Sequence, residues 1–520
     1  MTAAKQPKPP RQRRFMTHEA NFDIVAAMET LFARWFDGPS WDAWKVILRA
    51  AFALPMSKKE IAFFKTIAGD RDPPKKRVRE LWVVGGRRGG KDSVASLIAC
   101  YAAVFFRAGI DKLRPGERAL VQCLAVDRDQ SRVVLGYIRS FFDHLPPLRS
   151  MVTRETRDGL QLQNDCDIVV ATNSFRAVRG RSVLVSIFDE CAFWMSEDTS
   201  KPDTETYRAV LPSLMTLPGS MLVGISTPHK KSGLLFERYK KAFGQNDDKV
   251  LVIQAASQIL NPTLDADEIA AAYEDDASIA GAEYGACWRL DVEAFIDPEV
   301  VAACTISGVR ELPPLRGYHY VGFCDPSGGS SDSMTLAICH REGDRAIVDC
   351  VRERRPPFSP DDVVIEFAAT LKSYGVGTVH GDRYGGMWPS ERFAAHGVRY
   401  EACEQPKSDL YQALLPVLNA KRIDLLDIPR LASQLCSLER KTTRVGKDSI
   451  DHAQNAKDDV ANCVAGAVSF ALGHQGVVIT SELLKRVAAM PVTRKHTAWG
   501  FRRRTALANM VRQVGEKCPR

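Results

Sequence analysis

Residues 83–93 form the most constraining stretch of the chain, a glycine-rich sequence that reads VVGGRRGGKDS. The run ELWVVGG before it is typical of a buried strand, and KDSVASLIACYAAVFF after it is typical of a buried helix. Such a turn can direct backbone N–H groups and the positive end of the helix at a phosphate, while a lysine at the helix start neutralises charge. A glycine-rich turn without a ligand would not explain that lysine. The sequence therefore predicts a phosphate-binding loop, whose nucleotide-contacting residues would be Gly85, Gly86, Gly89, Gly90, Lys91, Asp92 and Ser93.

Asp92 departs from the usual pattern, which has Ser or Thr at this position to bind magnesium. A carboxylate is also a hard oxygen ligand, but it adds negative charge beside the phosphates. Lys91, Arg87 and Arg88 supply compensating charge, and Ser93 offers a hydroxyl one residue later. We expect a working site with an altered metal ligand.

A second buried run, SVLVSIFDE, ends in Asp189 and Glu190 and supplies the acids that such a loop needs. Asp189 would hold Mg²⁺, and Glu190 would orient and deprotonate the attacking water. The run GISTP places Thr227 where a γ-phosphate sensor would lie, although an ordinary turn after a strand explains it equally well. Arg87 and Arg88 would stabilise transition-state charge, or simply belong to a solvated basic loop.

Strands and helices alternate through the first half of the chain, which predicts an α/β domain with a mostly parallel sheet covered on both faces. Residues 22–68 have a helical apolar period. Residues 261–295 form an acid-rich helical connector, and RELPPLRG marks a boundary near residue 312.

The second half begins with three successive strands, YHYVGFCD, SMTLAICHR and AIVDCVRER. Asp325 ends the first strand, Asp382 ends the later run VHGD, and Asp458 and Asp459 open the last helix. Converging acids of this kind can hold two Mg²⁺ or Mn²⁺ ions that clamp a phosphodiester, which is nuclease chemistry. Each acid also has a simpler explanation, since Asp458 and Asp459 favour the helix dipole and Asp325 can cap a turn. Asp332 and Asp451 are further candidates, either as additional ligands or as residues that support the ligands, and His452 is a candidate to assist them, although a lone histidine is more often structural.

Charge is concentrated at the two ends of the chain. The net charge is +8, but the first sixteen residues contribute +5 and residues 485–520 contribute +9, which leaves −6 for the remainder. Basic ends indicate a polyanionic partner or solubilising extensions. No apolar run approaches the ~18–20 residues that a membrane span requires, and no apolar segment follows the basic start, so a cytoplasmic protein is expected. The thirteen scattered cysteines, without zinc spacing, predict reduced and mostly buried thiols.

Taken together, these motifs make the chain resemble the large terminase subunit of tailed bacteriophages, the motor and nuclease that packages viral DNA. The resemblance runs from about residue 45 to 472 and rests on GGRRGGKDS, AVRGRSVLVSIFDECAFW, GISTP, DPSGGSSDS, HGDRYGG and DHAQNAKDDVANCVAGA. It implies ATP hydrolysis by Lys91, Asp189 and Glu190, with Thr227 in the coupling element. It also implies an RNase H-like nuclease in which Asp325, Asp382 and Asp458 or Asp459 hold the cleavage metals.

The resemblance further implies double-stranded DNA, a portal protein and a small terminase subunit as partners of a homo-oligomeric ring on the procapsid, in the host cytoplasm. The expected organisation is a basic extension with a helical segment (1–44), a P-loop ATPase domain (45–295), a linker (296–315), an RNase H-like nuclease domain (316–474) and a basic tail (475–520). Two alternatives remain open. One is a catalytically silent, prophage-derived assembly factor that binds DNA, and the other is a P-loop helicase, which would need no acidic metal cluster in its second half.

Overall fold

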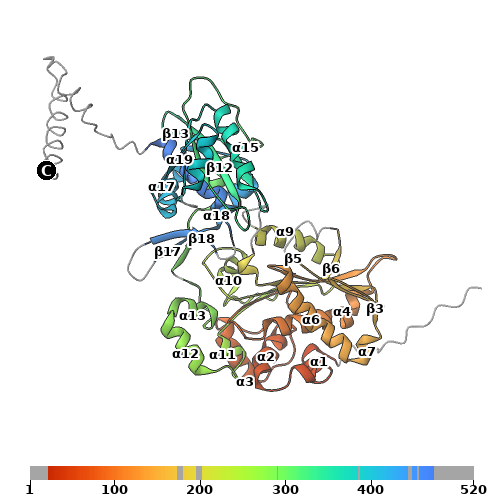
Figure 1. The fold of residues 1–520 in the computed structure, drawn as a ribbon. Coiled ribbons are helices and arrows are strands. Elements are labelled where there is room, and N and C mark those ends of the chain that lie inside the picture. Colours follow the sequence, from red (N-terminus) through yellow and green to blue (C-terminus); the bar gives the residue numbers. More distant parts are fainter. Residues whose placement is uncertain are drawn as a thin grey trace, which may run out of the picture. The chain divides into compact units, whose positions relative to one another are not determined.

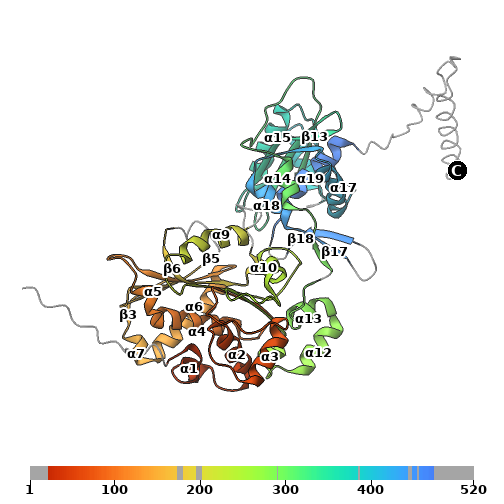
Figure 2. The same ribbon diagram turned by 180° about the vertical axis from the view of Figure 1, so that it is seen from behind.

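The structure is a computed structural model that describes residues 22–172, 180–194, 202–289, 291–383, 387–442, 448–453 and 456–473. The basic ends of the chain, at 1–21 and 474–520, lie outside the described residues, so their predicted contact with DNA stays a prediction. Figures 1 and 2 show the fold from opposite sides.

The first sheet has eight strands in the order β3-β4-β5-β2-β6-β7-β1-β8. From β5 to β8 all neighbouring strands are parallel, whereas β3, β4 and β5 pair in antiparallel fashion. The strands are β1 Glu80–Gly85, β2 Ala119–Ala125, β3 Val152–Thr156, β4 Gly159–Leu162, β5 Cys166–Thr172, β6 Ser182–Asp189, β7 Met221–Ser226 and β8 Val250–Ala255. The expected mostly parallel α/β sheet is therefore confirmed.

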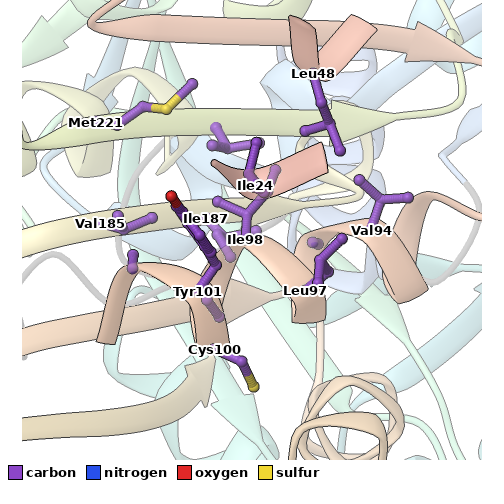
Figure 3. Close-up of a cluster of buried hydrophobic side chains, with 14 of the residues drawn as sticks. Ile24, Leu48, Val94, Leu97, Ile98, Cys100, Tyr101, Val185, Ile187 and Met221 are labelled. Carbon is purple, nitrogen blue, oxygen red and sulfur yellow. The ribbon is translucent and has the colours of Figure 1, made fainter. Parts of the chain in front are cut away.

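Helices cover both faces of this sheet, which is why its strands are apolar on both sides (Figures 1 and 2). In β1, Leu81 and Val83 pack into one core, and Trp82 and Val84 pack into the other. One face carries α1 Ile24–Glu29, α2 Asp42–Ala51, α3 Lys58–Ala68, α4 Lys91–Phe105 and α6 Arg128–His144, and the other carries α9 Pro202–Leu214 and α10 Leu234–Ala242. Figure 3 shows part of this first core, where Ile98 of α4 lies near Ile24 of α1 and Ile187 of β6.

Residues before position 45 belong to this first core rather than to a separate extension. Ile24, Met28, Phe32 and Phe36 are buried in it together with the sheet. A capping box at Ser57 begins α3, so the expected helical stretch is several short helices separated by turns. The division predicted at residue 44 therefore does not separate an independent segment among the described residues.

The second sheet has seven strands in the order β10-β16-β13-β12-β11-β14-β15. β11 Tyr320–Asp325, β12 Met334–Glu342 and β13 Arg345–Arg354 form an antiparallel meander, and β14 Thr378–Gly381 pairs in parallel with β11. β15 Arg399–Ala402 and β16 Ile423–Leu426 extend the two sides. One face carries α15 Pro360–Ser373 and α16 Trp388–Ala395, and the other carries α14 Pro298–Cys304, α17 Lys407–Asn419, α18 Pro429–Ser437 and α19 Asp459–Leu472. Three meander strands followed by strands parallel to the first are the arrangement expected of an RNase H-like domain.

The predicted linker at 296–315 is largely part of this second domain. Ile296, Val301 and Cys304 are buried in its core, and β10 Thr305–Ile306 pairs with β16. A separate small sheet joins β9 Val292–Ala294 to β17 Leu438–Thr442, which also pairs with β18 Asp448–His452. The chain therefore passes between the domains without a long unstructured connection in its described part.

Two expectations from composition can be checked against the described residues. All described cysteines except Cys287 and Cys436 are buried, and each is a free thiol. Among the described helices, none combines the length and apolar character needed to cross a bilayer.

Candidate functional site

The glycine loop turns from β1 into α4 in a space that leaves no room for side chains. A Cβ atom on Gly86 would lie 2.2 Å from Oγ of Ser257 and 2.7 Å from the carbonyl oxygen of Tyr284. Gly90 has a φ of 80°, in the left-handed region, and is followed by Lys91, the first residue of α4. Close packing and backbone conformation therefore require glycine at both positions.

Contacts from outside the loop fix its backbone. The side chain of Leu260 packs against the loop, since it would lie 3.0 Å from a Cβ atom on Gly85 and 2.8 Å from one on Gly89. Because C=O and N–H point in opposite directions across a trans peptide, anchoring a carbonyl outward turns the next N–H inward, toward a ligand. Three successive carbonyls are anchored in this way: Ser257 Oγ donates to Arg87 O at 2.6 Å, Asn261 Nδ2 to Arg88 O at 3.3 Å, and Trp44 Nε1 to Gly89 O at 2.7 Å.

The Lys91 ammonium lies buried where the strands β1, β7 and β6 end. Its Nζ donates to the carbonyl oxygens of Gly85 and Gly86, each at 3.2 Å, and to Oγ1 of Thr227 at 3.1 Å. It also lies 3.5 Å from Oε1 of Glu190. Since β7 lies between β1 and β6 in the sheet, the loop, the GISTP run and the acidic strand share one edge. The structure thus brings together residues from all three predicted motifs.

Three carboxyl groups surround this single ammonium. Asp189 is fully buried, and neither of its carboxylate oxygens has a hydrogen-bond partner in the described part of the chain. Burial, followed by the charges of Asp92 and Glu190, raises the pKa of Asp189 well above its usual value. Burial, followed by the charge of Glu190, also raises the pKa of Asp92. Two such carboxyl groups, of which Asp189 lacks a side-chain hydrogen-bond partner among the described residues, fit a divalent cation with oxygen ligands, and Asp189 and Asp92 would hold it.

Glu190 is held by the end of β7. It follows β6 in the left-handed region, with a φ of 46°. Its Oε2 accepts hydrogen bonds from the hydroxyl of Ser226 and from the backbone N–H of Thr227, each at 2.9 Å. Asp189 is positioned nearby, where its backbone carbonyl accepts from Nε1 of Trp194 at 2.9 Å. A change in the position of Glu190 would therefore directly affect Ser226 and Thr227 of the GISTP run.

The loop arginines are exposed, whereas these acids are buried or half-buried. The guanidinium of Arg87 pairs with Glu283 at 2.9 Å and is largely exposed. Arg88 is exposed and has a φ of 61°. Ser93 is half-buried in the first turn of α4. The predicted catalytic role of the arginines stays a prediction.

The second candidate site lies at the ends of β11 and β14. These strands are parallel neighbours, with Cys324 opposite Gly381, so Asp325 and Asp382 follow at the same edge. Nδ2 of Asn462, from α19, donates to Oδ2 of Asp325 at 2.9 Å and to Oδ2 of Asp382 at 2.8 Å. The sequence prediction that these two acids converge is matched by this geometry.

Electrostatics indicate that positive charge compensates this pair only in part, because Lys407 lowers the pKa of Asp382 by less than burial raises it. Burial, followed by the charge of Asp382, raises the pKa of Asp325 to about 8. Burial also raises the pKa of Asp382. Oδ1 of Asn462 is buried without a hydrogen-bond partner among the described residues. Paired carboxylates with an unsatisfied amide oxygen beside them form an oxygen-rich donor set that fits Mg²⁺ or Mn²⁺.

The acids at the start of α19 have different surroundings. Asp458 is buried, and its Oδ2 accepts from the Tyr411 hydroxyl at 2.8 Å and lies 2.9 Å from Nζ of Lys407. Burial, followed by the charge of Asp458, raises the pKa of Asp459, whose Oδ2 is buried without a partner in the described residues. Asp332 pairs with Lys457.

Asp451 and His452 lie in β18, near Asp458. One ligand atom from each of these three residues lies within 4.8 Å of the other two. Asp451 also pairs with Lys407 at 2.9 Å. The additional candidates Asp451 and His452 therefore adjoin Asp458, whereas Asp332 is engaged by its own lysine.

Several residues of these sites were missed in the sequence. Asn462 follows Asp458 by four residues, one helical turn, so helical spacing could have identified it. Lys407 and Tyr411 come from α17, and no local pattern links them to the acids. The anchors of the glycine loop, Trp44 and Ser257, are likewise distant in sequence.

Comparisons with known proteins were made by family, by sequence and by structure. No family model and no curated protein matches the chain. The large terminase of bacteriophage HK97 is similar in structure over 82% of this chain and 99% of its own, with a TM-score of 0.36 and 16% identity. The large terminase of a thermophilic bacteriophage, in complex with ADP, is similar over 83% and 98%, with a TM-score of 0.35 and 11% identity. The large terminase nuclease of the thermophilic phage G20c with bound magnesium is similar over 31% and 93%, with a TM-score of 0.28 and 17% identity. The structural neighbours are thus large terminase chains of tailed phages, as the motifs suggested, with low TM-scores and low sequence identity.

Proposed function

We propose that this chain is an ATP-driven motor that translocates double-stranded DNA into a procapsid and cuts concatemeric DNA with a metal-dependent endonuclease. The observation that carries the proposal is the presence of two separate acidic centres in one chain. Lys91, Asp189, Glu190 and Thr227 meet at one edge of the first sheet. A second centre, around Asp325, lies at an edge of the second sheet. A P-loop helicase would not require the second centre.

In the ATPase centre the inward N–H groups of the loop and Lys91 would bind the phosphates. Glu190 would accept the proton of the attacking water, and its bonds to Ser226 and Thr227 would pass its movement to the end of β7. Mg²⁺ held by Asp189 and Asp92 would neutralise charge on the β- and γ-phosphates.

In the nuclease centre Asp325 and Asp382 would hold a divalent cation, with Asn462 fixing their orientation. Such a cation polarises a phosphodiester and activates water. The raised pKa of Asp325 implies that cation binding displaces a proton from this site.

The partners follow from the family resemblance. They are double-stranded DNA, the portal protein and a small terminase subunit, with the motor assembled as a homo-oligomeric ring on the procapsid in the host cytoplasm. The basic ends of the sequence, at +5 and +9, suit contact with DNA.

The deciding experiment measures ATP hydrolysis with and without DNA, and plasmid cleavage, by the purified full chain in Mg²⁺, Mn²⁺ or EDTA. The proposal expects both activities, both abolished by EDTA. DNA binding without either activity would favour the silent assembly factor, and ATP-dependent strand separation without cleavage would favour the helicase.

A further inference from the structure

Lys407 stands among the acids of the second centre as a fixed positive charge. It is the first residue of α17, and its Nζ lies 2.9 Å from Oδ1 of Asp451 and 2.9 Å from Oδ2 of Asp458. Asp458 is buried and is held from another side by the Tyr411 hydroxyl. The ammonium therefore joins two carboxylates that come from different elements, β18 and the residue before α19.

The groups around this ammonium have the spacing of a cation site. Asp451, His452 and Asp458 each offer one ligand atom, and these atoms lie within 4.8 Å of one another. Oxygen and imidazole donors at this spacing would suit a divalent ion. Lys407 already supplies a cation to two of the three.

The neighbouring acids Asp325 and Asp382 have no ion-pair partner among the described residues, although the charge of Lys407 also acts on Asp382. Asp325 and Asp382 are joined by the neutral amide of Asn462, whose Oδ1 is itself buried and unpaired among the described residues. The centre thus has two halves, one in direct contact with an ammonium and one, at Asp325 and Asp382, without a cation in contact among the described residues.

We propose that Lys407 is a resident cation that takes the place of a second divalent ion. On this proposal, which rests on the proposed nuclease function, the centre binds one divalent cation, at Asp325 and Asp382. Lys407 supplies the other positive charge facing the DNA phosphodiester. This departs from the two-metal arrangement expected from the acids alone.

The test counts Mn²⁺ bound per full-length chain, by electron paramagnetic resonance of the free ion and by calorimetry. An Asp92→Ala/Asp189→Asn background removes the two carboxylates that would hold a cation in the ATPase centre. In this background we expect one Mn²⁺ per chain with Lys407 intact and two with Lys407→Gln, because the emptied Asp451–Asp458 pair would then accept an ion. Adding Asp458→Asn to Lys407→Gln should return the count to one, and Lys407→Arg, which keeps the charge, should leave it at one.

Lys457→Gln is the matched control. It removes an equal charge from a lysine next in sequence to Asp458 that pairs instead with Asp332, so the count should stay at one. Two ions with Lys407 intact, or one ion in a folded Lys407→Gln protein, would overturn the role of Lys407 and leave the nuclease proposal standing. No bound Mn²⁺ together with no plasmid cleavage would overturn both.

Discussion

Asp92 offers the most direct test of the ATPase centre, because two substitutions separate its possible roles. Asp92→Ser restores the hydroxyl that the usual loop places there, and Asp92→Ala removes the oxygen altogether. In the structure, Asp92 is close to other charged groups of the ATPase centre. It lies near Asp189 and Glu190, with Lys91 as the ammonium among the three carboxyl groups.

The expected magnitudes follow from the ligand set. With serine, one oxygen ligand from α4 is retained, and one negative charge beside the phosphates is lost. We expect the ATPase rate at saturating Mg²⁺ to stay within about tenfold of wild type, a barrier change of roughly 1.4 kcal/mol. With alanine, Asp189 alone would hold the ion, so the Mg²⁺ concentration for half-maximal rate should rise by about tenfold or more.

The assay is ATP hydrolysis against Mg²⁺ concentration for the wild type, Asp92→Ser and Asp92→Ala. Circular dichroism checks that the variants are folded. Both are expected to be, because the hydrogen bond from Ser96 Oγ to the backbone carbonyl of Asp92 does not involve the substituted side chain. An inactive wild type that gains activity on Asp92→Ser would refute the reasoning, since it would mean that the carboxylate only repels the phosphates.

Three further predictions concern turnover and DNA binding, and one concerns pH. Glu190→Gln should abolish ATP turnover but spare nucleotide binding, measured by calorimetry, because it removes a base and no phosphate contact; equal loss of both would contradict this. Asp382→Asn should eliminate metal-dependent plasmid cleavage and spare ATP hydrolysis, and cleavage at the wild-type rate would show that the acids are misassigned. Deletion of 485–520 removes nine net positive charges, so DNA affinity and its salt dependence should both fall, and an unchanged salt slope would assign the tail another role. In EDTA, Asp325→Asn should raise Tm relative to wild type by at least about 2 °C more at pH 8.5 than at pH 5. The pKa of Asp325 in the folded protein is about 8, above the ordinary value of 3.8, so the wild type loses free energy of unfolding as pH rises toward 8 and this carboxyl group ionises, whereas the Asn variant does not. A Tm difference between the two proteins that does not change with pH would contradict the raised pKa.

Local patterns were sufficient for the elements that carry the sites. The apolar runs before Gly85, Asp189 and Asp325 each form a buried strand that ends where predicted. This works because strands covered on both faces are apolar throughout and because parallel strands end at one edge. The convergence of Asp325 with Asp382 follows from the same rule.

Domain boundaries were harder to predict from the sequence, because packing between residues that are distant in the sequence decides them. Polar and apolar residues mix in 22–44, yet Phe32 and Phe36 pack against α6, where Phe141 contacts both rings. The proline-rich stretch near residue 312 suggested a linker, but α14 and β10 before it belong to the second core. Local composition therefore predicts where the chain turns, but it does not predict which hydrophobic core a segment packs into.

The roles of Asp92, which departs from the usual loop pattern, and of Lys407 could not be interpreted from sequence for one physical reason. A charged side chain repels or binds according to the charges that face it, and these come from other elements. Asp92 is in α4, but its pKa is raised by burial and by Glu190 beyond β6, a setting that favours cation binding there. Lys407 is in α17, but its partners come from β18 and from the residue before α19. In the first centre the Asp92 carboxylate adds negative charge that favours binding of a cation, and in the second the Lys407 ammonium neutralises part of the negative charge. The number of metal ions that each proposed centre would bind therefore depends on contacts between elements rather than on either motif alone.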